Sequence, residues 1–275
     1  MGSPIILTFD IEDWFQVENL KGQISKDEWE DKKLRVKDNT EKILNLLDRY
    51  NQQATFFVLG WIAERVPELV KEIHKKGHEV ASHGYGHELI YNLTAEQFRE
   101  DIRKSKLILE NIIGEEIYGY RAPSFSITEW ALDILNEEGF LYDSSYFPSD
   151  FHDRYSKINL DSESNSFVKI YKENFYEIPI STFNSFGKNF PVGGGGYFRL
   201  LPYFIYRKIF QKSVKQNKGG NFYLHPWEID YKQPKVDNLK LLYKFRHYYG
   251  QKNCISKLNN IFKDFKFNKI ISIIE

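Results

Sequence analysis

Residues 4–10 read PIILTFD, an apolar run rich in β-branched side chains that ends on a carboxylate. Such a run predicts a buried strand followed by a polar loop. Downstream, residues 39–51 carry apolar side chains on one helical face, and residues 54–60 form a second apolar run. Residues 61–77 then predict one helix with a basic last turn, and residues 78–84 a third strand. This alternation indicates a parallel sheet with crossover helices, an α/β fold.

Helix starts are marked by capping residues. Asn39 is expected to open the first helix, and Thr94 with Gln97 forms a capping box ahead of a helix that reaches about Ile113. The segment 148–198 is different, because it is polar, aromatic and β-like and ends in four glycines. We interpret it as an irregular β-rich insertion, or an irregular part of a barrel, within a single domain that spans residues 1–275.

Composition excludes several classes of protein. The 38 basic and 38 acidic residues balance, so the net charge does not indicate binding to nucleic acid or to an anionic membrane. The single cysteine, Cys254, excludes an intrachain disulfide framework and is expected to be structural. The N-terminal residues lack a basic, apolar leader, and no window approaches the roughly 18 apolar residues of a membrane span. A cytoplasmic protein is therefore the expectation, and the oligomeric state stays open.

Titratable side chains follow the ends of several predicted strands. They are Asp10, Glu12 and Asp13 after the first strand, His83 and His87 after the third, Arg121, Asp143, and His225 near a late strand. In parallel α/β folds the carboxyl ends of the strands meet at one edge, where the loops build the site. We therefore expect these side chains to converge.

His83 and His87 lie four residues apart, which on a helix would suggest a zinc protease. Gly84 and Gly86 break a helix here, so we interpret the pair as belonging to a loop. Two imidazoles and one carboxylate form a catalytic zinc site with an open position, whereas a plain turn would leave both histidines idle.

Each of the other candidates also has a structural interpretation. The acids after residue 10 could belong to a solvated loop, Arg121 could be a surface residue, and His225 could cap a helix and pack against Trp227. A functional Arg121 would hold a buried carboxylate. The remaining histidines with basic neighbours are expected to be solvated; they are His74, His78 and His247.

Taken in order, these motifs resemble those of the polysaccharide deacetylases, also called NodB-homology or carbohydrate esterase family 4 proteins. The resemblance rests on TFDIEDW (8–14), SHGYGH (82–87), GYRAPSF (119–125), YDSSYFP (142–148) and YLHPWE (223–228). With GGGGYFRLLPY (193–203) the chain looks like the branch associated with exopolysaccharide loci. The resemblance implies a distorted (β/α) barrel with about seven parallel strands and a divalent metal, usually zinc.

The resemblance also implies roles for individual residues. Asp10 matches the catalytic base, Arg121 the residue that orients it, His225 the general acid, and His83 and His87 metal ligands. The family's first motif has adjacent aspartates, but here Ile11 follows Asp10, so the third ligand is Glu12 or Asp13. The acid that pairs with the acid histidine is replaced by Tyr146, which leaves the tuning of His225 unexplained and Asp143 a weak candidate.

The predicted reaction is metal-dependent hydrolysis of an N-acetyl group on an amino sugar of a polysaccharide or glycan precursor, which releases acetate. Candidate walls for the sugar are Trp14, Phe125, Tyr197 and Trp227, and the backbone at 193–196 could approach a ligand. The main alternative on the same fold is hydrolysis of a non-sugar amide, such as a cyclic ureide or imide. Two further alternatives are a glycoside hydrolase and a non-catalytic carbohydrate-binding module.

Overall fold

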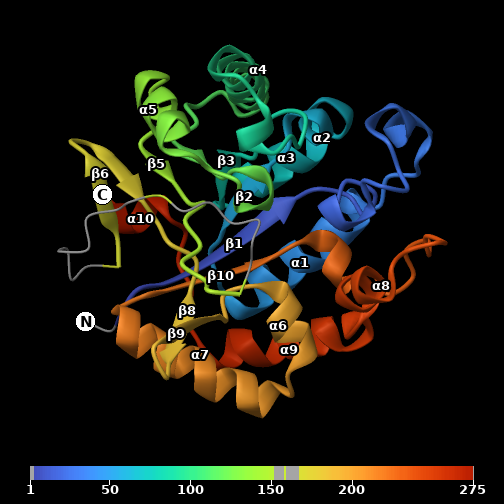
Figure 1. The fold of residues 1–275 in the computed structure, drawn as a ribbon, viewed down its shortest axis with the longest axis vertical. Helices are drawn as coiled ribbons and strands as arrows, with labels where there is room; N and C mark the ends of the chain where they lie inside the picture. The colour runs from blue at the N-terminus through green and yellow to red at the C-terminus, as the bar shows by residue number, and fades with distance from the viewer. Residues whose placement is uncertain (1–2, 152–157, 159–166, 275) are drawn as a thin grey trace.

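The computed structural model describes residues 3–151, 158 and 167–274. Its centre is a curled sheet of eight strands in the order β10-β1-β2-β3-β4-β5-β7-β6 (Figure 1). All neighbours pair in parallel except β6 and β7, so seven strands run parallel, as predicted. The strands are β1 (Ile5–Ile11), β2 (Thr55–Val58), β3 (Glu79–Ser82), β4 (Gly119–Tyr120), β5 (Tyr142–Asp143), β6 (Lys169–Lys172), β7 (Phe175–Glu177) and β10 (Gly220–Leu224).

Backbone contacts bring the two ends of the curled sheet close together. The amide of Ser181, just after β7, donates to the carbonyl of Asn221 in β10, and the amide of Tyr223 donates to the carbonyl of Gly193. The chain after β7 therefore lies along β10, and the prediction of a distorted barrel is confirmed.

Helices cover the outside of the sheet (Figure 1). They are α1 (Val36–Tyr50), α2 (Gly60–Arg65), α3 (Pro67–Lys75), α4 (Ala95–Ile113), α5 (Glu129–Glu137), α6 (Gly195–Leu200), α7 (Tyr203–Asn217), α8 (Leu241–Tyr248), α9 (Gln251–Asp264) and α10 (Ile271–Ile274). Among the described residues, none of these helices is both long enough and apolar enough to cross a bilayer.

Two predicted helix boundaries are wrong and one is confirmed. The expected single helix 61–77 is divided into α2 and α3 at Pro67, which starts the second helix. The first helix begins at Val36, so Asn39 lies inside it and does not cap it. Thr94 and Gln97 form the predicted capping box at the start of α4, which ends at Ile113 before Gly114.

The segment 148–198 is β-rich, although residues 152–157 and 159–166 lie outside the described residues. It contains the antiparallel pair β6–β7 and a second pair, β8 (Thr182–Ser185) with β9 (Lys188–Pro191). Because β7 pairs with β5 in the main sheet, part of this segment belongs to the barrel. The shared sheet, in which β1 near the start pairs with β10 near the end, is why we keep the prediction of a single domain.

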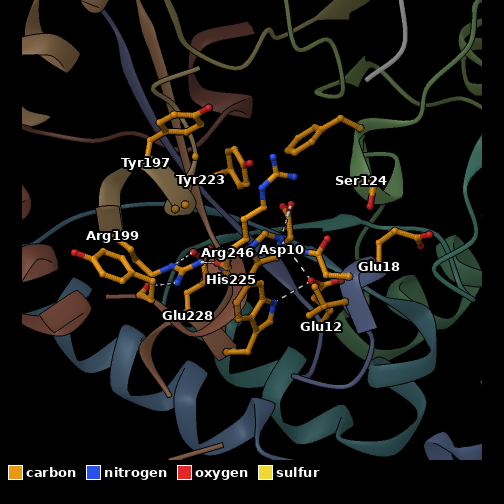
Figure 2. Close-up of a pocket in the computed structure, with 18 of the residues that line it drawn as sticks. Asp10, Glu12, Glu18, Ser124, Tyr197, Arg199, Tyr223, His225, Glu228 and Arg246 are labelled. Atoms are coloured by element: carbon orange, nitrogen blue, oxygen red, sulfur yellow. Dashed lines mark hydrogen bonds and ion pairs between the residues drawn. The ribbon is translucent and has the colours of Figure 1, made fainter. Parts of the chain in front are cut away.

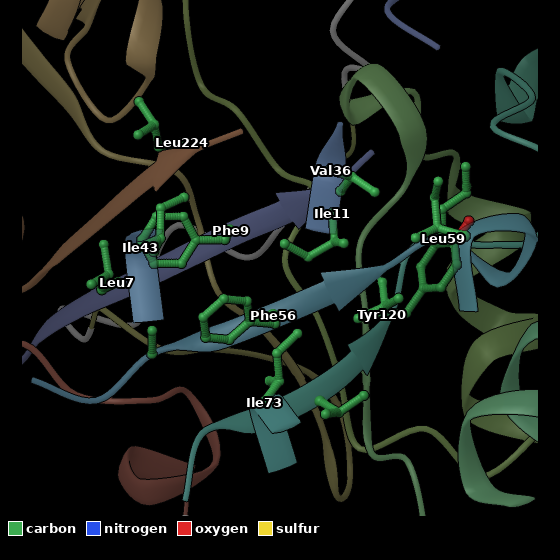
Figure 3. Close-up of a cluster of buried hydrophobic side chains, with 14 of the residues drawn as sticks. Leu7, Phe9, Ile11, Val36, Ile43, Phe56, Leu59, Ile73, Tyr120 and Leu224 are labelled. Carbon is green, nitrogen blue, oxygen red and sulfur yellow. The ribbon is translucent and has the colours of Figure 1, made fainter. Parts of the chain in front are cut away.

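Side chains of β1 alternate between two surroundings. Leu7, Phe9 and Ile11 pack with Phe56 and other apolar side chains between the sheet and the helices (Figure 3). Ile6 belongs to a separate apolar cluster with Phe57. Because successive strand side chains point to opposite faces, Thr8 and Asp10 share the face of Ile6 and turn into the barrel.

The solvated positions predicted for two histidines are wrong. His78 is 4% exposed and its ring lies 5.2 Å from that of Phe56, while His247 is fully buried and stacks on Trp227. Basic residues next to a histidine in the sequence do not tell whether that histidine is buried, because the lysines can extend to solvent while the imidazole packs inward. His74 is partly exposed, and Cys254 is buried in α9, as a structural cysteine should be.

Candidate active site and metal centre

Asp10 and Arg121 form a buried ion pair inside the barrel. Nη1 of Arg121 donates to Oδ1 of Asp10 over 2.6 Å and to Oγ1 of Thr8 over 2.8 Å. Nε donates to the carbonyl oxygen of Ser144 over 2.8 Å, and the side chain of Arg121 is fully buried. The guanidinium is thus fixed by β1 and by the residue after β5, and its charge-assisted hydrogen bond holds the Asp10 carboxylate in one orientation.

Glu12, His83 and His87 bring three potential metal ligands together. One ligand atom from each lies within 4.8 Å of the others, and all three residues are buried. Nδ1 of His83 lies 2.8 Å from the carbonyl oxygen of Arg121, which leaves Nε2 as its free ligand atom. Oε2 of Glu12 lies 2.5 Å from Nε2 of His87 but is a buried oxygen without a hydrogen bond among the described residues. A metal ion would satisfy that oxygen, so the donor set fits a divalent cation.

The loop that carries both histidines needs a glycine at position 84. Gly84 has a φ of +72°, and a Cβ there would lie 2.6 Å from Oδ2 of Asp101 in α4. The Asp101 carboxylate accepts hydrogen bonds from the amides of Tyr85 (2.8 Å) and Gly86 (3.1 Å). His87 itself has a φ of +54°, a conformation that a non-glycine residue adopts at some cost and that is common at functional sites.

The protonation states of this group suit metal binding. Burial lowers the pKa of His83 to about 4, so its imidazole is neutral near pH 7. Burial acts to raise the pKa of Glu12, but the nearby imidazoles of His87 and His225 outweigh it and hold that pKa below its usual value. A neutral imidazole and an ionised carboxylate are the forms that coordinate zinc.

Asp13, the other candidate for the third ligand, lies apart from this group. Its carboxylate accepts hydrogen bonds from the backbone amides of Trp14 (2.8 Å), Arg35 (2.6 Å) and Val36 (2.9 Å). Because the last two amides start α1, Asp13 satisfies the free N–H groups of that helix from outside it. This contact also explains why Asn39 is not needed as a cap.

His225 is paired with a residue that the sequence analysis did not single out. Nδ1 of His225 lies 2.9 Å from Oε1 of Glu228, and Oε2 of Glu228 accepts a 2.6 Å hydrogen bond from Nε of Arg199 (Figure 2). Burial acts to lower the pKa of His225, but the carboxylates of Glu12 and Glu228 raise it to about 9. The remaining nitrogen, Nε2, lies 3.7 Å from Asp10 and 3.5 Å from Glu12.

Asp143 does not reach His225. Its carboxylate accepts hydrogen bonds from the amide and hydroxyl of Ser145, and the buried Glu177 binds the same amide. Neither Asp143 nor Tyr146 lines the pocket that contains His225. The partner of His225 is therefore Glu228, from its own turn, HPWE. The sequence signal that could have identified this partner is the His-Pro-x-Glu spacing. In a turn opened by proline, the side chain at the third position can return to the first.

Comparisons with known proteins identify the family of this chain. A family model described as polysaccharide deacetylase matches residues 2–142, just over half of the 275 residues. The chain belongs to the polysaccharide deacetylase family. Residues 144–275 match a domain of unknown function, DUF3473, which is characteristic of deacetylases from exopolysaccharide loci.

Individual family members are similar over part or all of the chain. A peptidoglycan deacetylase of Helicobacter pylori is 33% identical over 135 residues, 46% of each protein, so the match spans about half of that relative. A Mycobacterium smegmatis structure assigned to the polysaccharide deacetylases has a TM-score of 0.61 at 18% identity and covers 98% of this chain and 88% of its own. A Bacillus anthracis protein described as a family 4 pseudoenzyme has a TM-score of 0.54 at 12% identity, with 100% and 66% covered. The fold is thus shared with a pseudoenzyme.

In this family member, Asp10, Glu12, His83, His87 and His225 open into one cavity of about 330 Å³. Three of the four predicted sugar walls line it: Phe125, Tyr197 and Trp227. The prediction for Trp14 is wrong, because its ring is buried against Phe15, 5.6 Å away, and its Nε1 donates to the carbonyl of Lys33. The chain turns after β1, where Asp13 binds the amide of Trp14, and this turn directs the indole into the core.

The glycines at 193–196 serve close packing at the side of this cavity. A Cβ on Gly195 would lie 2.1 Å from Oε1 of Glu228, and one on Gly194 would lie 2.5 Å from the hydroxyl oxygen of Tyr223. A Cβ on Gly196 would meet nothing within 4 Å. The Gly195 contact shows that α6 can approach Glu228 only without a side chain at that position, and this approach places Arg199 within reach of that carboxylate.

Proposed function

We propose that the protein is a metal-dependent N-deacetylase that hydrolyses the N-acetyl group of an amino sugar in a polysaccharide or glycan precursor and releases acetate. One observation carries this proposal: the three-residue ligand group opens into the same cavity as Asp10 and His225. A carbohydrate-binding module or a pseudoenzyme has no need of a ligand group beside a paired carboxylate and a paired histidine. The family assignment supports the same activity.

Glu12, His83 and His87 would hold the metal, and we propose zinc, because two imidazoles and one carboxylate are a common ligand set for catalytic zinc. Such an ion supplies a Lewis acid for the acetyl carbonyl oxygen and lowers the pKa of water at the site to about 7. Trp227 fixes the carboxylate of Glu12, since its Nε1 donates to Oε1 over 3.0 Å.

Asp10 is the proposed general base, which removes the proton from the attacking water. Arg121 holds one oxygen of Asp10, so the other oxygen is the one available for that proton. His225 is the proposed general acid. Its proton at Nε2 passes to the amine nitrogen of the sugar as the carbon–nitrogen bond breaks, and Glu228 holds the opposite ring nitrogen.

Aromatic side chains supply the proposed sugar contacts. Phe125, Tyr197 and Trp227 offer flat apolar surfaces, against which the apolar face of a sugar ring can pack. A cavity of about 330 Å³ is at the small end of ligand pockets, so it suits one sugar residue and its acetyl group.

The assignment to the cytoplasm stays a prediction from the sequence.

Metal analysis combined with an acetate-release screen tests the proposal. We expect about one zinc ion per chain after purification without chelator, and acetate release from an N-acetylhexosamine oligosaccharide or precursor that stops when the metal is chelated. Stoichiometric metal with ring opening of a cyclic ureide, and no acetate from any N-acetylated glycan, would support the alternative on the same fold. No contact in the described residues favours that alternative at present.

A further inference from the structure

Helix α8 forms a wall of the cavity and is covered on one side only. His247 is its only buried residue, and its ring stacks on Trp227. Figure 1 shows α8 at the edge of the molecule. Leu242, Phe245 and Tyr249 line the cavity and are also 56%, 48% and 47% exposed. Apolar side chains at the cavity mouth are thus open to solvent.

The exposed side chains of α8 form a continuous stripe. At about 100° per residue, Leu241, Leu242 and Phe245 of α8 fall on one face with Tyr249, the residue directly after the helix, opposite Tyr243 and the buried His247. Leu241 is 86% exposed and does not line the cavity, so a small ligand in the cavity leaves it uncovered. Leu200 of α6, 41% exposed, adjoins the stripe at the same cavity mouth. We call these five residues the α8 rim.

Cations flank the α8 rim. Lys240 precedes the helix, and on the helical projection Lys244 and Arg246 border the apolar stripe on opposite sides. Within the described residues, the side chains of these three form no ion pair with an acidic residue. An apolar stripe bordered by free lysine and arginine side chains is typical of a helix that lies in the interface of an anionic bilayer.

We propose that the α8 rim docks the protein on an anionic lipid surface, with the mouth of the cavity turned toward that surface. The leucine and phenylalanine side chains enter the acyl region, and the cations bind lipid phosphates. This proposal does not depend on the proposed activity. If both hold, the natural substrate is a glycan that is held at a membrane.

The chemistry of the rim favours lipid over the other occupants. Aliphatic side chains such as Leu241 do not stack on sugar rings or hydrogen-bond a polysaccharide, but they insert between acyl chains. A two-turn helix about 12 Å long is small for the roughly 800 Å² that each partner buries in a stable protein interface. Self-association and binding of an acidic polysaccharide are therefore outcomes of the test.

Sedimentation with vesicles tests the proposal directly. The protein is mixed with vesicles of phosphatidylcholine alone or of equimolar phosphatidylcholine and phosphatidylglycerol. We expect binding to the anionic vesicles that weakens with added salt. A K240Q/L241S/K244Q variant should bind about ten-fold or more weakly, because each cation near an anionic surface contributes about five-fold. The matched control, K71Q/K75Q/L107S, changes exposed residues of the same types on α3 and α4 and should bind like the wild type.

A labelling experiment gives an answer even if the triple variant does not fold. A polarity-sensitive dye on Leu241→Cys should shift to the blue with anionic vesicles, whereas the same dye on Leu107→Cys should not. Cys254 is buried and does not compete for the dye. The proposal is overturned if the wild type does not bind anionic vesicles, or if both triple variants weaken equally. It is also overturned if the wild type is a dimer and the rim substitutions convert it to a monomer. The same holds if these substitutions abolish binding to a soluble acidic polysaccharide but leave vesicle binding unchanged.

Discussion

Nδ1 of His225 lies 2.9 Å from Oε1 of Glu228, three residues along the same turn. This contact fixes the ring so that Nε2 faces Asp10 and Glu12. The carboxylate of Glu228 is itself held by Arg199, whose guanidinium also donates to the carbonyl oxygens of Arg246 and His247. His225, the proposed general acid, is thus oriented by a chain of contacts that begins in α6.

A Glu228→Gln substitution should therefore lower kcat about 10- to 100-fold with little change in KM, because it removes the charge that orients His225 and stabilises its proton. Metal content should stay near that of the wild type. Steady-state kinetics and metal analysis check this. The matched control is Asp230→Asn, which breaks the ion pair with Arg35 outside the cavity and should lower stability only. Equal kcat losses in both variants would contradict the role of Glu228.

Substitution of Glu12 and Asp13 separates the two candidates for the third ligand. Glu12→Gln should lose most of the metal, because it removes the charged oxygen beside His87. Asp13→Ala should keep the metal but lower the free energy of unfolding by about 1–2 kcal/mol, the usual cost of a lost helix cap. Metal analysis and thermal unfolding measure the two effects. Metal loss in Asp13→Ala alone would reverse the assignment.

The sequence predicted the barrel and part of the cavity, because both follow from local patterns. Asp10 ends an apolar run whose alternation turns it into the barrel, and the glycines between His83 and His87 exclude a helix. Strands β4 and β5 have two residues each, too short for a periodic signal, and were expected only as parts of longer strand-like segments.

Residues whose roles depend on distant contacts could not be assigned from sequence. Asp13 caps a helix that starts 23 residues later, and Glu228 is held by Arg199, 29 residues earlier. Trp14 and His247 were misassigned because polar or aromatic character does not tell which side of a loop or helix is packed. Local pattern predicts strands and helices, whereas the partners of loop residues depend on the whole fold.

Asp10→Asn should abolish deacetylation, with a loss of about 10²- to 10⁴-fold for a missing general base, while metal content stays near stoichiometric. Asparagine preserves the shape of the side chain and can still accept the hydrogen bond of Arg121. His83→Ala is the contrasting variant, since it should lose metal and activity together. Acetate release and metal analysis on the same samples distinguish the two. Near-normal turnover in Asp10→Asn would refute the assignment of the base.

Acid should destabilise the protein partly through His78. Burial against Phe56 lowers the pKa of His78 to about 4, below the ordinary value of 6.5, and its nitrogens have no partner among the described residues. The unfolded chain therefore takes up this proton at a higher pH than the folded protein does. The resulting stability is complete above pH 6.5 and is lost as the pH falls toward 4, by up to about 3 kcal/mol.

A His78→Phe variant isolates this contribution. It keeps an aromatic ring beside Phe56 but cannot bind a proton, so its free energy of unfolding should fall less than that of the wild type between pH 7 and pH 4.5. Urea unfolding at several pH values measures the difference. His74→Phe, which replaces a partly exposed imidazole, should retain the pH dependence of the wild type. If His78→Phe also retains the pH dependence of the wild type, the acid sensitivity arises from other buried groups. His78 would then have the same pKa in the folded and the unfolded chain and would not contribute.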